Sequence, residues 1–302
     1  MTKAALTLVA AVLLGGQAQA VPTTGLTIIP APRFDVPVSV SDAEARLETR
    51  RVTLRKIILV GDSTVQVGTG WGGAFCAMHV AAVTPCIDMA LGGRSTLNYR
   101  AEGSWGIALN EARAPGFSRV YMLIQFGHND QPGKPGQSTD LETEFPQNLK
   151  RYVLDARRAG AVPVLVTPLT RRDFVAGSLQ DSLAPWADKV IEVARMLNVP
   201  VVDLHKMSVD LVQALGPLAS LDLSVNQPPK SVVEAAKRVT SIGAFKPGIR
   251  QPGKTGVAAR KALASVTFDY THLGPQGTGT FAQQVAKALV VAVPDLRGQV
   301  KP

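Results

Sequence analysis

The stretch Lys56-Ile57-Ile58-Leu59-Val60-Gly61-Asp62-Ser63-Thr64 is an apolar run that ends in a glycine and a polar triplet. Its aliphatic, largely β-branched residues predict a strand buried on both faces, as in a parallel sheet. Gly61 permits the backbone angles of a tight turn, so we expect Ser63 at the carboxyl end of this strand. Ligands of open α/β sheets bind at that edge. For this motif alone, a plain cap made by Asp62, Ser63 and Thr64 is the competing interpretation.

Similar apolar runs recur along the chain and alternate with helical patterns. Further strands are predicted at 86–90, 119–126, 162–166 and 199–202, and helices at 41–51, 74–82, 145–158, 184–197 and 281–291. This alternation indicates right-handed crossovers and a parallel sheet. The expected fold class is α/β, a flavodoxin-like three-layer α/β/α arrangement around a central five-stranded parallel sheet.

The first 20 residues have the pattern of a signal peptide. Lys3 gives a positive start, an apolar core follows, and Ala18-Gln19-Ala20 is a small-x-small cleavage site. We therefore expect export to the periplasm or the extracellular space, with cleavage after about Ala20. No later run approaches the roughly 20 apolar residues that a membrane span needs, so we expect no stable membrane insertion.

The remaining 282 of the 302 residues are assigned to one large domain with additions, since 46% of the chain is hydrophobic and can bury a full core. Residues 21–55 are expected to form an N-terminal arm, residues 56–296 the domain, and residues 297–302 a tail. An insertion is expected at about 226–262, where 226–261 holds eight Lys or Arg and one acidic residue. It is either a solvated loop or a basic lip that contacts an acidic substrate.

Charge and cysteine usage limit the partners. The formal net charge is +9, or +8 once Lys3 is removed, and no basic stretch is interleaved with aromatic residues. Nucleic acid is therefore not an expected partner, whereas an acidic polymer or an anionic envelope surface suits the sign of the charge, as simple solubility also does. Cys76 and Cys86 are the only cysteines; they can pair in an oxidising compartment and are too few for a cysteine-rich zinc site.

Polar residues at the predicted strand ends are of the types that acyl transfer needs. A serine hydroxyl becomes a good nucleophile when a histidine takes its proton and a carboxylate orients that histidine. Asp269 and His272 lie three residues apart in one loop and can serve Ser63 in this way. Donors for a developing oxyanion are available at the Ser63 amide, the Gly93 amide and the Asn129 side chain.

These blocks, in this order, resemble the SGNH (GDSL) hydrolase superfamily. They are G-D-S-T with Ser63, a glycine at Gly93, G-H-N-D with Asn129, and D-x-x-H with Asp269 and His272. G-H-N-D, G-R-S-T and D-Y-T-H-L resemble the rhamnogalacturonan acetylesterase branch in particular. The resemblance covers about 56–223 and 266–292 and departs from the family pattern at position 88, where an aspartate stands in place of a frequent asparagine.

The resemblance implies a secreted serine carbohydrate esterase that removes O-acetyl groups from a polysaccharide such as pectin or rhamnogalacturonan. Ser63 would be the nucleophile, His272 the general base and then acid, and Asp269 its orienting partner. Ser63, Gly93 and Asn129 would form the oxyanion hole, with no metal or organic cofactor. The alternatives are a general short-chain acyl esterase or lysophospholipase of the same superfamily, and a non-catalytic carbohydrate-binding module.

Other residues are candidates for the substrate cleft. Asp62, Arg94, His128 and Trp71 lie in or beside the motifs, although His128 can equally be a structural histidine and Trp71 a core residue. Asp203 and His205 form a rival acid and base pair at the end of the fifth predicted strand and rank below Asp269 and His272. No set of residues has the spacing of a metal site. The oligomeric state is left open by the sequence.

Overall fold

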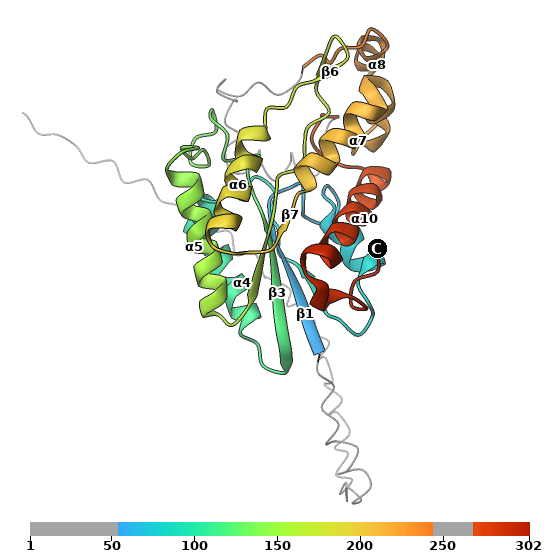
Figure 1. Ribbon diagram of the computed structural model, residues 1–302. Coiled ribbons are helices and arrows are strands. Elements are labelled where there is room, and N and C mark those ends of the chain that lie inside the picture. The colour runs from blue at the N-terminus through green and yellow to red at the C-terminus, as the bar shows by residue number, and fades with distance from the viewer. Residues whose placement is uncertain (1–53, 244–267) are drawn as a thin grey trace, which may run out of the picture. The chain divides into compact units, whose positions relative to one another are not determined.

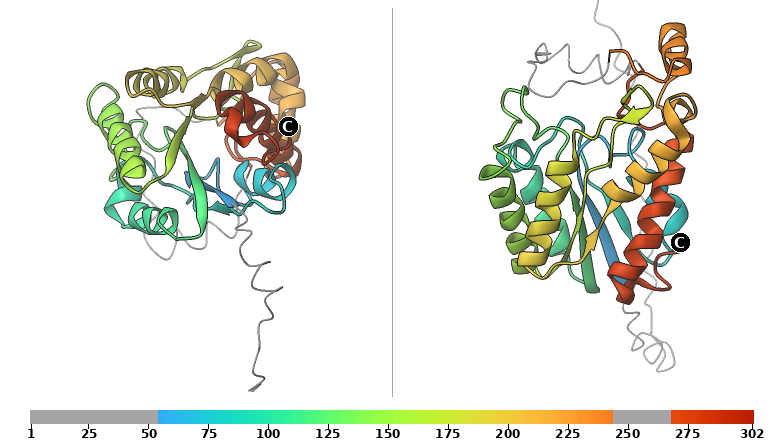
Figure 2. Two further views of the ribbon diagram at one scale, coloured as in Figure 1. Left: turned by 60° about the horizontal axis from the view of Figure 1, so that its bottom comes forward. Right: turned by 45° about the horizontal axis from the view of Figure 1, so that its top comes forward.

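The computed structural model describes residues 54–243 and 268–302. The predicted signal peptide, the 41–51 helix, almost all of the predicted arm and the 244–262 part of the insertion lie outside the described residues. Five parallel strands form the sheet, in the order β2 (Cys86–Asp88), β1 (Leu54–Gly61), β3 (Phe117–Gln125), β4 (Val162–Val166) and β7 (Val201–Val202). Helices cover both faces (Figures 1 and 2), so the predicted α/β fold class is confirmed.

The apolar run of β1 faces two separate hydrophobic cores. Ile57 and Leu59 pack into the core beneath α7 (Leu204–Ala219) and α10 (Pro275–Ala292). Ile58 and Val60 pack into the opposite core, and all four side chains are fully buried. That second core is built with α4 (Ser104–Ala112), α5 (Glu144–Arg158) and α6 (Ala184–Met196). Successive strand residues point to opposite faces, so a strand between two helical layers needs apolar residues throughout.

The remaining elements are short. They are α2 (Gly72–Ala74), the π-helical turn η1 (Phe75–His79), α3 (Asn98–Ala101), the hairpin of β5 (Phe174–Val175) and β6 (Ser178–Leu179), the 3₁₀ turns η2 (Ser220–Leu223) and η3 (Pro294–Leu296), and α8 (Lys230–Lys237).

Several predicted elements differ from those observed. The helix predicted at 74–82 is shorter than expected and consists of α2 followed by η1. It ends at His79, because the backbone is extended at Val80, which forms a β-bridge with Val300. The helix predicted from 281 begins at Pro275, a residue that suits a first helical turn. Part of the predicted loop-like insertion is α8, which buries Val232 and Ala236 against Tyr270.

Helices α3, α4 and α7 and the hairpin of β5 and β6 were not predicted from the sequence. Residues of α4 pack into one core and residues of α7 into the other, so these helices lie on both sides of the sheet. The predicted C-terminal tail is in part ordered, since Val300 is only 2% exposed. Within the described residues no helix has both the length and the apolar character needed to cross a membrane.

The two cysteines form a disulfide that joins η1 to β2, with 5.4 Å between the Cα atoms of Cys76 and Cys86. The link closes a loop around residues 77–85 and ties the edge strand β2 to the helical layer. A covalent link across this edge restricts the unfolded chain and thereby stabilises the folded one.

We expect the double substitution Cys76→Ser with Cys86→Ser to lower the free energy of unfolding by about 2–4 kcal/mol, as for a disulfide that closes a short loop. Urea unfolding, followed by circular dichroism, measures this. Wild-type protein unfolded with a reductant present should match the double variant. Equal unfolding midpoints for the oxidised wild type and the variant would contradict the prediction.

Candidate active site

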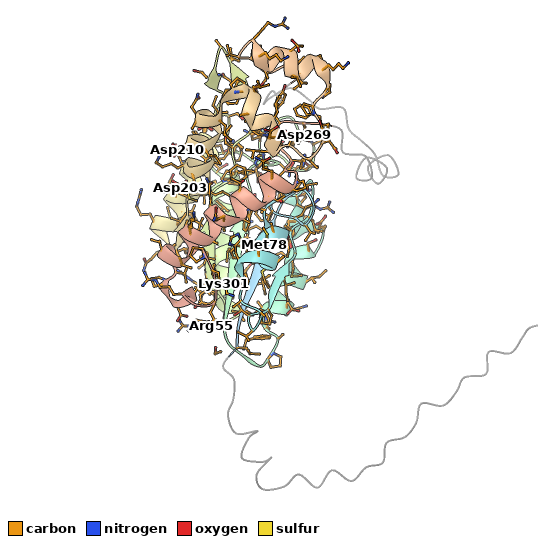
Figure 3. All side chains as sticks on the ribbon, turned by 90° about the vertical axis from the view of Figure 1, so that its right-hand side faces the viewer. Arg55, Met78, Asp203, Asp210, Asp269 and Lys301 are labelled. Carbon is orange, nitrogen blue, oxygen red and sulfur yellow. A yellow bond between two sulfur atoms is a disulfide. The ribbon has the colours of Figure 1, made fainter. Side chains whose placement is uncertain are left out.

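The residues predicted to carry chemistry meet at the carboxyl edge of the sheet. A pocket of about 480 Å³ lies there, and Ser63, Asn129, Asp269 and His272 are among the residues that line it. Figure 3 shows Asp269 in the upper part of the described unit and Arg55, at the start of β1, near its lower end. The strands therefore run toward the pocket, as expected for an open parallel sheet.

Ser63, His272 and Asp269 form a continuous hydrogen-bonded relay. Ser63 Oγ lies 2.8 Å from His272 Nε2, and His272 Nδ1 lies 2.6 Å from Asp269 Oδ2. The other carboxylate oxygen of Asp269 accepts from the backbone N–H groups of Thr271 and His272, each at 2.7 Å. The loop therefore fixes both the carboxylate and the ring that the carboxylate orients.

The environment of Asp269 keeps it ionised. Burial raises the pKa of a carboxyl, but the hydrogen bond and charge of His272 and two backbone N–H donors outweigh burial and lower the pKa of Asp269 to about 2. A carboxylate next to Nδ1 holds the proton on that nitrogen, so His272 Nε2 can accept the hydroxyl proton of Ser63.

The nucleophile turn is built by close backbone packing. A Cβ at Gly61 would lie 2.7 Å from the carbonyl oxygen of Gln125, so only glycine fits there. Asp62 Oδ1 accepts from the backbone N–H of Thr64 at 2.8 Å and from its hydroxyl at 2.7 Å. Asp62 is fully buried and is not among the described residues that line the pocket. Its predicted place in the cleft is therefore wrong, because its carboxyl holds the turn.

Two contacts tie the base loop to the nucleophile turn. Thr69 Oγ1 donates to the carbonyl oxygen of Ser63 at 2.9 Å, and the carbonyl of Thr69 accepts from the N–H of Leu273 at 2.9 Å. Thr69 thus connects the chain at Ser63 with the residue that follows His272.

The three predicted oxyanion donors lie on adjacent loops. Ser63 and Asn129 line the pocket, whereas Gly93 is not among its described lining residues. Gly93 has a φ of +77°, which favours glycine. Asn129 Nδ2 donates to the carbonyl oxygen of Arg94 at 2.8 Å. An amide nitrogen carries two hydrogens, so this contact leaves one of them for another acceptor.

Of the other residues predicted for the cleft, His128 lines the pocket and Arg94 is not among its described lining residues. His128 is nearly buried, with Nε2 2.7 Å from the Leu169 carbonyl oxygen. Burial, together with the charges of Arg171 and Lys134, holds the pKa of His128 well below its usual value, so the ring is neutral. The side chain of Arg94 instead pairs with Glu102 at 3.0 Å.

Trp71 is a core residue, so its predicted place in the cleft is wrong. The side chain is fully buried, its Nε1 donates to Gln125 Oε1 at 2.9 Å, and its ring packs edge-on against Phe75. A tryptophan in this position supports the sheet beneath the site and cannot stack on a ligand.

Asp203 and His205, the alternative acid and base pair, have hydrogen-bond partners other than each other. Asp203 caps the N-terminus of α7 by accepting from the N–H of Lys206, and it also accepts from Thr167 Oγ1 at 3.0 Å. His205 Nε2 lies 3.0 Å from Asp181 Oδ2 instead. Burial disfavours a charged His205, but the hydrogen bond and charge of Asp181 outweigh it and raise the pKa of His205.

Position 88 keeps a supporting contact despite its departure from the family pattern. Asp88 Oδ1 accepts from the backbone N–H of Ala90 at 3.0 Å. Burial raises the pKa of Asp88 to about 7.

Among the described residues no group of three or more His, Cys, Asp or Glu side chains is placed to hold a metal ion.

Two cationic residues of the pocket were missed by the sequence analysis. Lys134 and Arg171 both line it, and Arg171 is only 3% exposed. Arg171 follows β4 at the same sheet edge as Ser63, a position that the strand pattern could have flagged. The lining also includes the apolar side chains of Val232, Ile242 and Phe268.

Arg172, also missed, holds the loop that carries the acid and the base. Its guanidinium donates to the carbonyl oxygens of Asp269 at 3.2 Å, Thr271 at 3.3 Å and His272 at 2.9 Å. Its backbone N–H donates to the carbonyl of Tyr270 at 3.0 Å. One buried residue therefore binds four consecutive carbonyl groups.

We expect Arg172→Met to lower the free energy of unfolding by about 2–4 kcal/mol, since the carbonyl groups of Asp269, Thr271 and His272 lose their guanidinium donor. It should also slow the labelling of Ser63 by a fluorophosphonate probe about 10- to 100-fold at a temperature where the variant is folded, because His272 loses its fixed position. Arg195→Met, at an exposed position of α6, is the matched control. Labelling of the Arg172 variant at the control rate would show that the clamp does not position the base.

Comparisons with known proteins identify the family. The model of the GDSL-like Lipase/Acylhydrolase family matches residues 59–220. Rhamnogalacturonan acetylesterase RhgT of Bacillus subtilis (strain 168) is 36% identical over 178 residues, which cover 56% of this chain and 73% of that protein. "Probable rhamnogalacturonan acetylesterase YesY" of the same organism is 32% identical over 159 residues, 50% of this chain and 71% of that protein.

A solved structure shows the same fold. The crystal structure of the protein YXIM from Bacillus subtilis superposes with a TM-score of 0.53 at 20% identity, covering 79% of this chain and 56% of that one. This likeness concerns the fold alone, whereas the family model and the two relatives confirm the resemblance drawn from the motifs. The chain therefore belongs to the GDSL-like lipase/acylhydrolase family, within which it is rhamnogalacturonan acetylesterase-like, and it is a carboxylester hydrolase.

Proposed function

We propose that this enzyme is an exported serine esterase that removes O-acetyl groups from a polysaccharide, most specifically a pectin-type polymer such as rhamnogalacturonan. The observation that carries the proposal is the relay from Ser63 Oγ through His272 to Asp269, open to a pocket. Acyl transfer to serine needs this order of groups and a cavity in which an ester can lie against them.

The reaction proceeds in two halves. Ser63 Oγ attacks the acetyl carbonyl carbon while His272 Nε2 takes the hydroxyl proton, and the carbonyl oxygen gains the negative charge. The C–O bond to the sugar then breaks, and His272 returns the proton to the departing sugar oxygen. In the second half a water molecule, deprotonated by His272, attacks the acetyl-serine and releases acetate, which restores the Ser63 hydroxyl.

The developing negative charge is held by hydrogen-bond donors. The backbone N–H of Ser63, the N–H of Gly93 and Asn129 Nδ2 are the proposed donors. Donors fixed in advance stabilise the tetrahedral intermediate more than the planar ester, and that difference lowers the barrier. Asp269 stabilises the imidazolium of His272 during the same step.

The pectin-type substrate is supported by similarity and by charge. Two relatives carry names of rhamnogalacturonan acetylesterases. Two cationic side chains, Lys134 and Arg171, line the pocket beside one carboxylate, Asp269, so positive charge is in excess among the described lining residues. A uronic-acid polymer brings carboxylates to such a pocket, whereas a neutral xylan does not. Export is proposed from the leader pattern of residues 1–20.

We expect Ser63→Ala and His272→Ala each to reduce acetate release from acetylated rhamnogalacturonan by about 10⁴-fold or more, because each removes a group that acts in the bond-making step. Acetate is measured enzymatically, with acetylated xylan and a small aryl acetate in parallel. Variants that keep wild-type rates would refute the assigned nucleophile and base. A wild type that binds the polymer but releases no acetate from any ester would instead indicate a carbohydrate-binding module.

We expect Arg171→Gln to lower the ratio of kcat/KM for acetylated rhamnogalacturonan to that for acetylated xylan roughly tenfold, the effect of losing one charge-assisted hydrogen bond. Only the ratio tests the charge, since loss of Arg171 contacts to Gln131 and Ser182 affects both substrates. Arg195→Gln, exposed on α6, should leave the ratio unchanged. An unchanged ratio in Arg171→Gln would remove the electrostatic argument for a uronic-acid polymer.

A further inference from the structure

We infer that Lys134 is a positioning residue of the oxyanion site, whose ammonium group fixes the side-chain amide of Asn129 and adds positive charge to the pocket in which the oxyanion develops. The inference rests on the proposed function, because it assigns Lys134 a part in the same acyl transfer. The sequence motifs and the comparisons assign no role to this residue.

The contacts of Lys134 determine which way the Asn129 amide points. Lys134 Nζ donates to Asn129 Oδ1 at 2.9 Å and to the carbonyl oxygen of His128 at 2.7 Å. An ammonium group can only donate, so the amide atom that faces it must be the oxygen. Nδ2 then faces the other way, toward the carbonyl of Arg94 at 2.8 Å. Lys134 and Arg94 thus hold opposite ends of the amide that we assign to the oxyanion.

A tight turn holds the backbone of Lys134 in place. The N–H of Lys134 donates to Ser138 Oγ at 2.9 Å, and its carbonyl accepts from the N–H of Ser138 at 2.9 Å. Ser138 Oγ also donates to the carbonyl of Gln131 at 2.8 Å, and the N–H of Thr139 donates to the carbonyl of Asp130 at 2.9 Å. The side chain therefore enters the pocket from an ordered turn directly after the G-H-N-D block.

The charge of Lys134 is costly in the resting enzyme. Burial and, next, the nearby charge of Arg171, from the loop after β4, lower the pKa of Lys134 to about 8, although Asp62 after β1 and Asp130 after β3 act in the opposite direction. The rings of His128 and His272 are also close enough to interact electrostatically with this group of charges. The carboxyl groups of Asp62 and Asp130 are themselves buried, and burial raises the pKa of each, that of Asp130 to about 7.

A cation in this setting favours the transition state over the resting state. The free-energy cost of burying the Lys134 ammonium falls when negative charge develops on the carbonyl oxygen next to Asn129. The resting ester carries no such charge. The ammonium is present below about pH 8 and is lost above it, so its contribution to the rate should fall as pH rises through that value. A merely structural contact would not give turnover this dependence on pH.

The test compares pH profiles of kcat and KM on a small aryl acetate for wild type, Lys134→Met and Lys134→Arg. Lys287→Met, an exposed lysine of α10, is the matched control. We expect Lys134→Met to lose about tenfold or more in kcat near pH 7 with little change in KM, a smaller effect than removal of an oxyanion donor itself. Its profile should lack the wild-type decline above about pH 8.

Lys134→Arg separates charge from packing. Arginine stays charged at all accessible pH values, so this variant should recover much of the lost kcat and show no decline near pH 8. A thermal-unfolding scan of each variant verifies that folded protein is compared.

The inference is overturned if Lys134→Met retains the wild-type kcat or the wild-type alkaline decline while Ser63→Ala abolishes turnover, and the proposed function then stands. It is also overturned if Lys134→Arg behaves like Lys134→Met. If Ser63→Ala itself keeps the wild-type rate, the proposed mechanism fails and the role of Lys134 fails with it.

Discussion

The hydrogen bond between Ser63 and His272 joins residues that are 209 positions apart, and the rest of the structure serves to keep them 2.8 Å apart. The sheet fixes one partner, because Ser63 leaves β1 through a turn too tight for any residue but glycine at position 61. The other partner stands on a loop without regular structure. Such a loop cannot hold a ring in place by itself, so it is fastened from outside by Arg172 and by Thr69.

The sequence was a good guide where the signal is local. An apolar run followed by G-D-S predicts a strand and the residue at its end, and D-x-x-H places acid and base within one turn. The five parallel strands and the relay were accessible for this reason. Helices α3, α4 and α7 were not, because α3 has only four residues, α4 contains Gly106, and α7 has Gly216 and Pro217 in its last turn, which are poor helix formers.

The residues that the sequence did not reveal lie outside the motif blocks. Arg171 and Arg172 bind partners on other loops, whereas Lys134 binds His128 and Asn129 within its own loop, and no motif includes any of the three. Trp71 and Asp62 show the reverse error, since they lie in or beside motif blocks and were expected in the cleft, but both are fully buried. A motif marks which segments gather at a site; it does not say which side chains of those segments reach the ligand.

The long separation between nucleophile and base has a consequence for biosynthesis. Ser63, the five strands of the sheet and Asn129 all precede residue 203, whereas His272 follows Ser63 by 209 positions. A polypeptide synthesised only as far as β7 has the serine without its proton acceptor. The helix α10 begins three residues after His272 and packs on the core, so the docking of this helix brings the histidine to the serine and completes the relay.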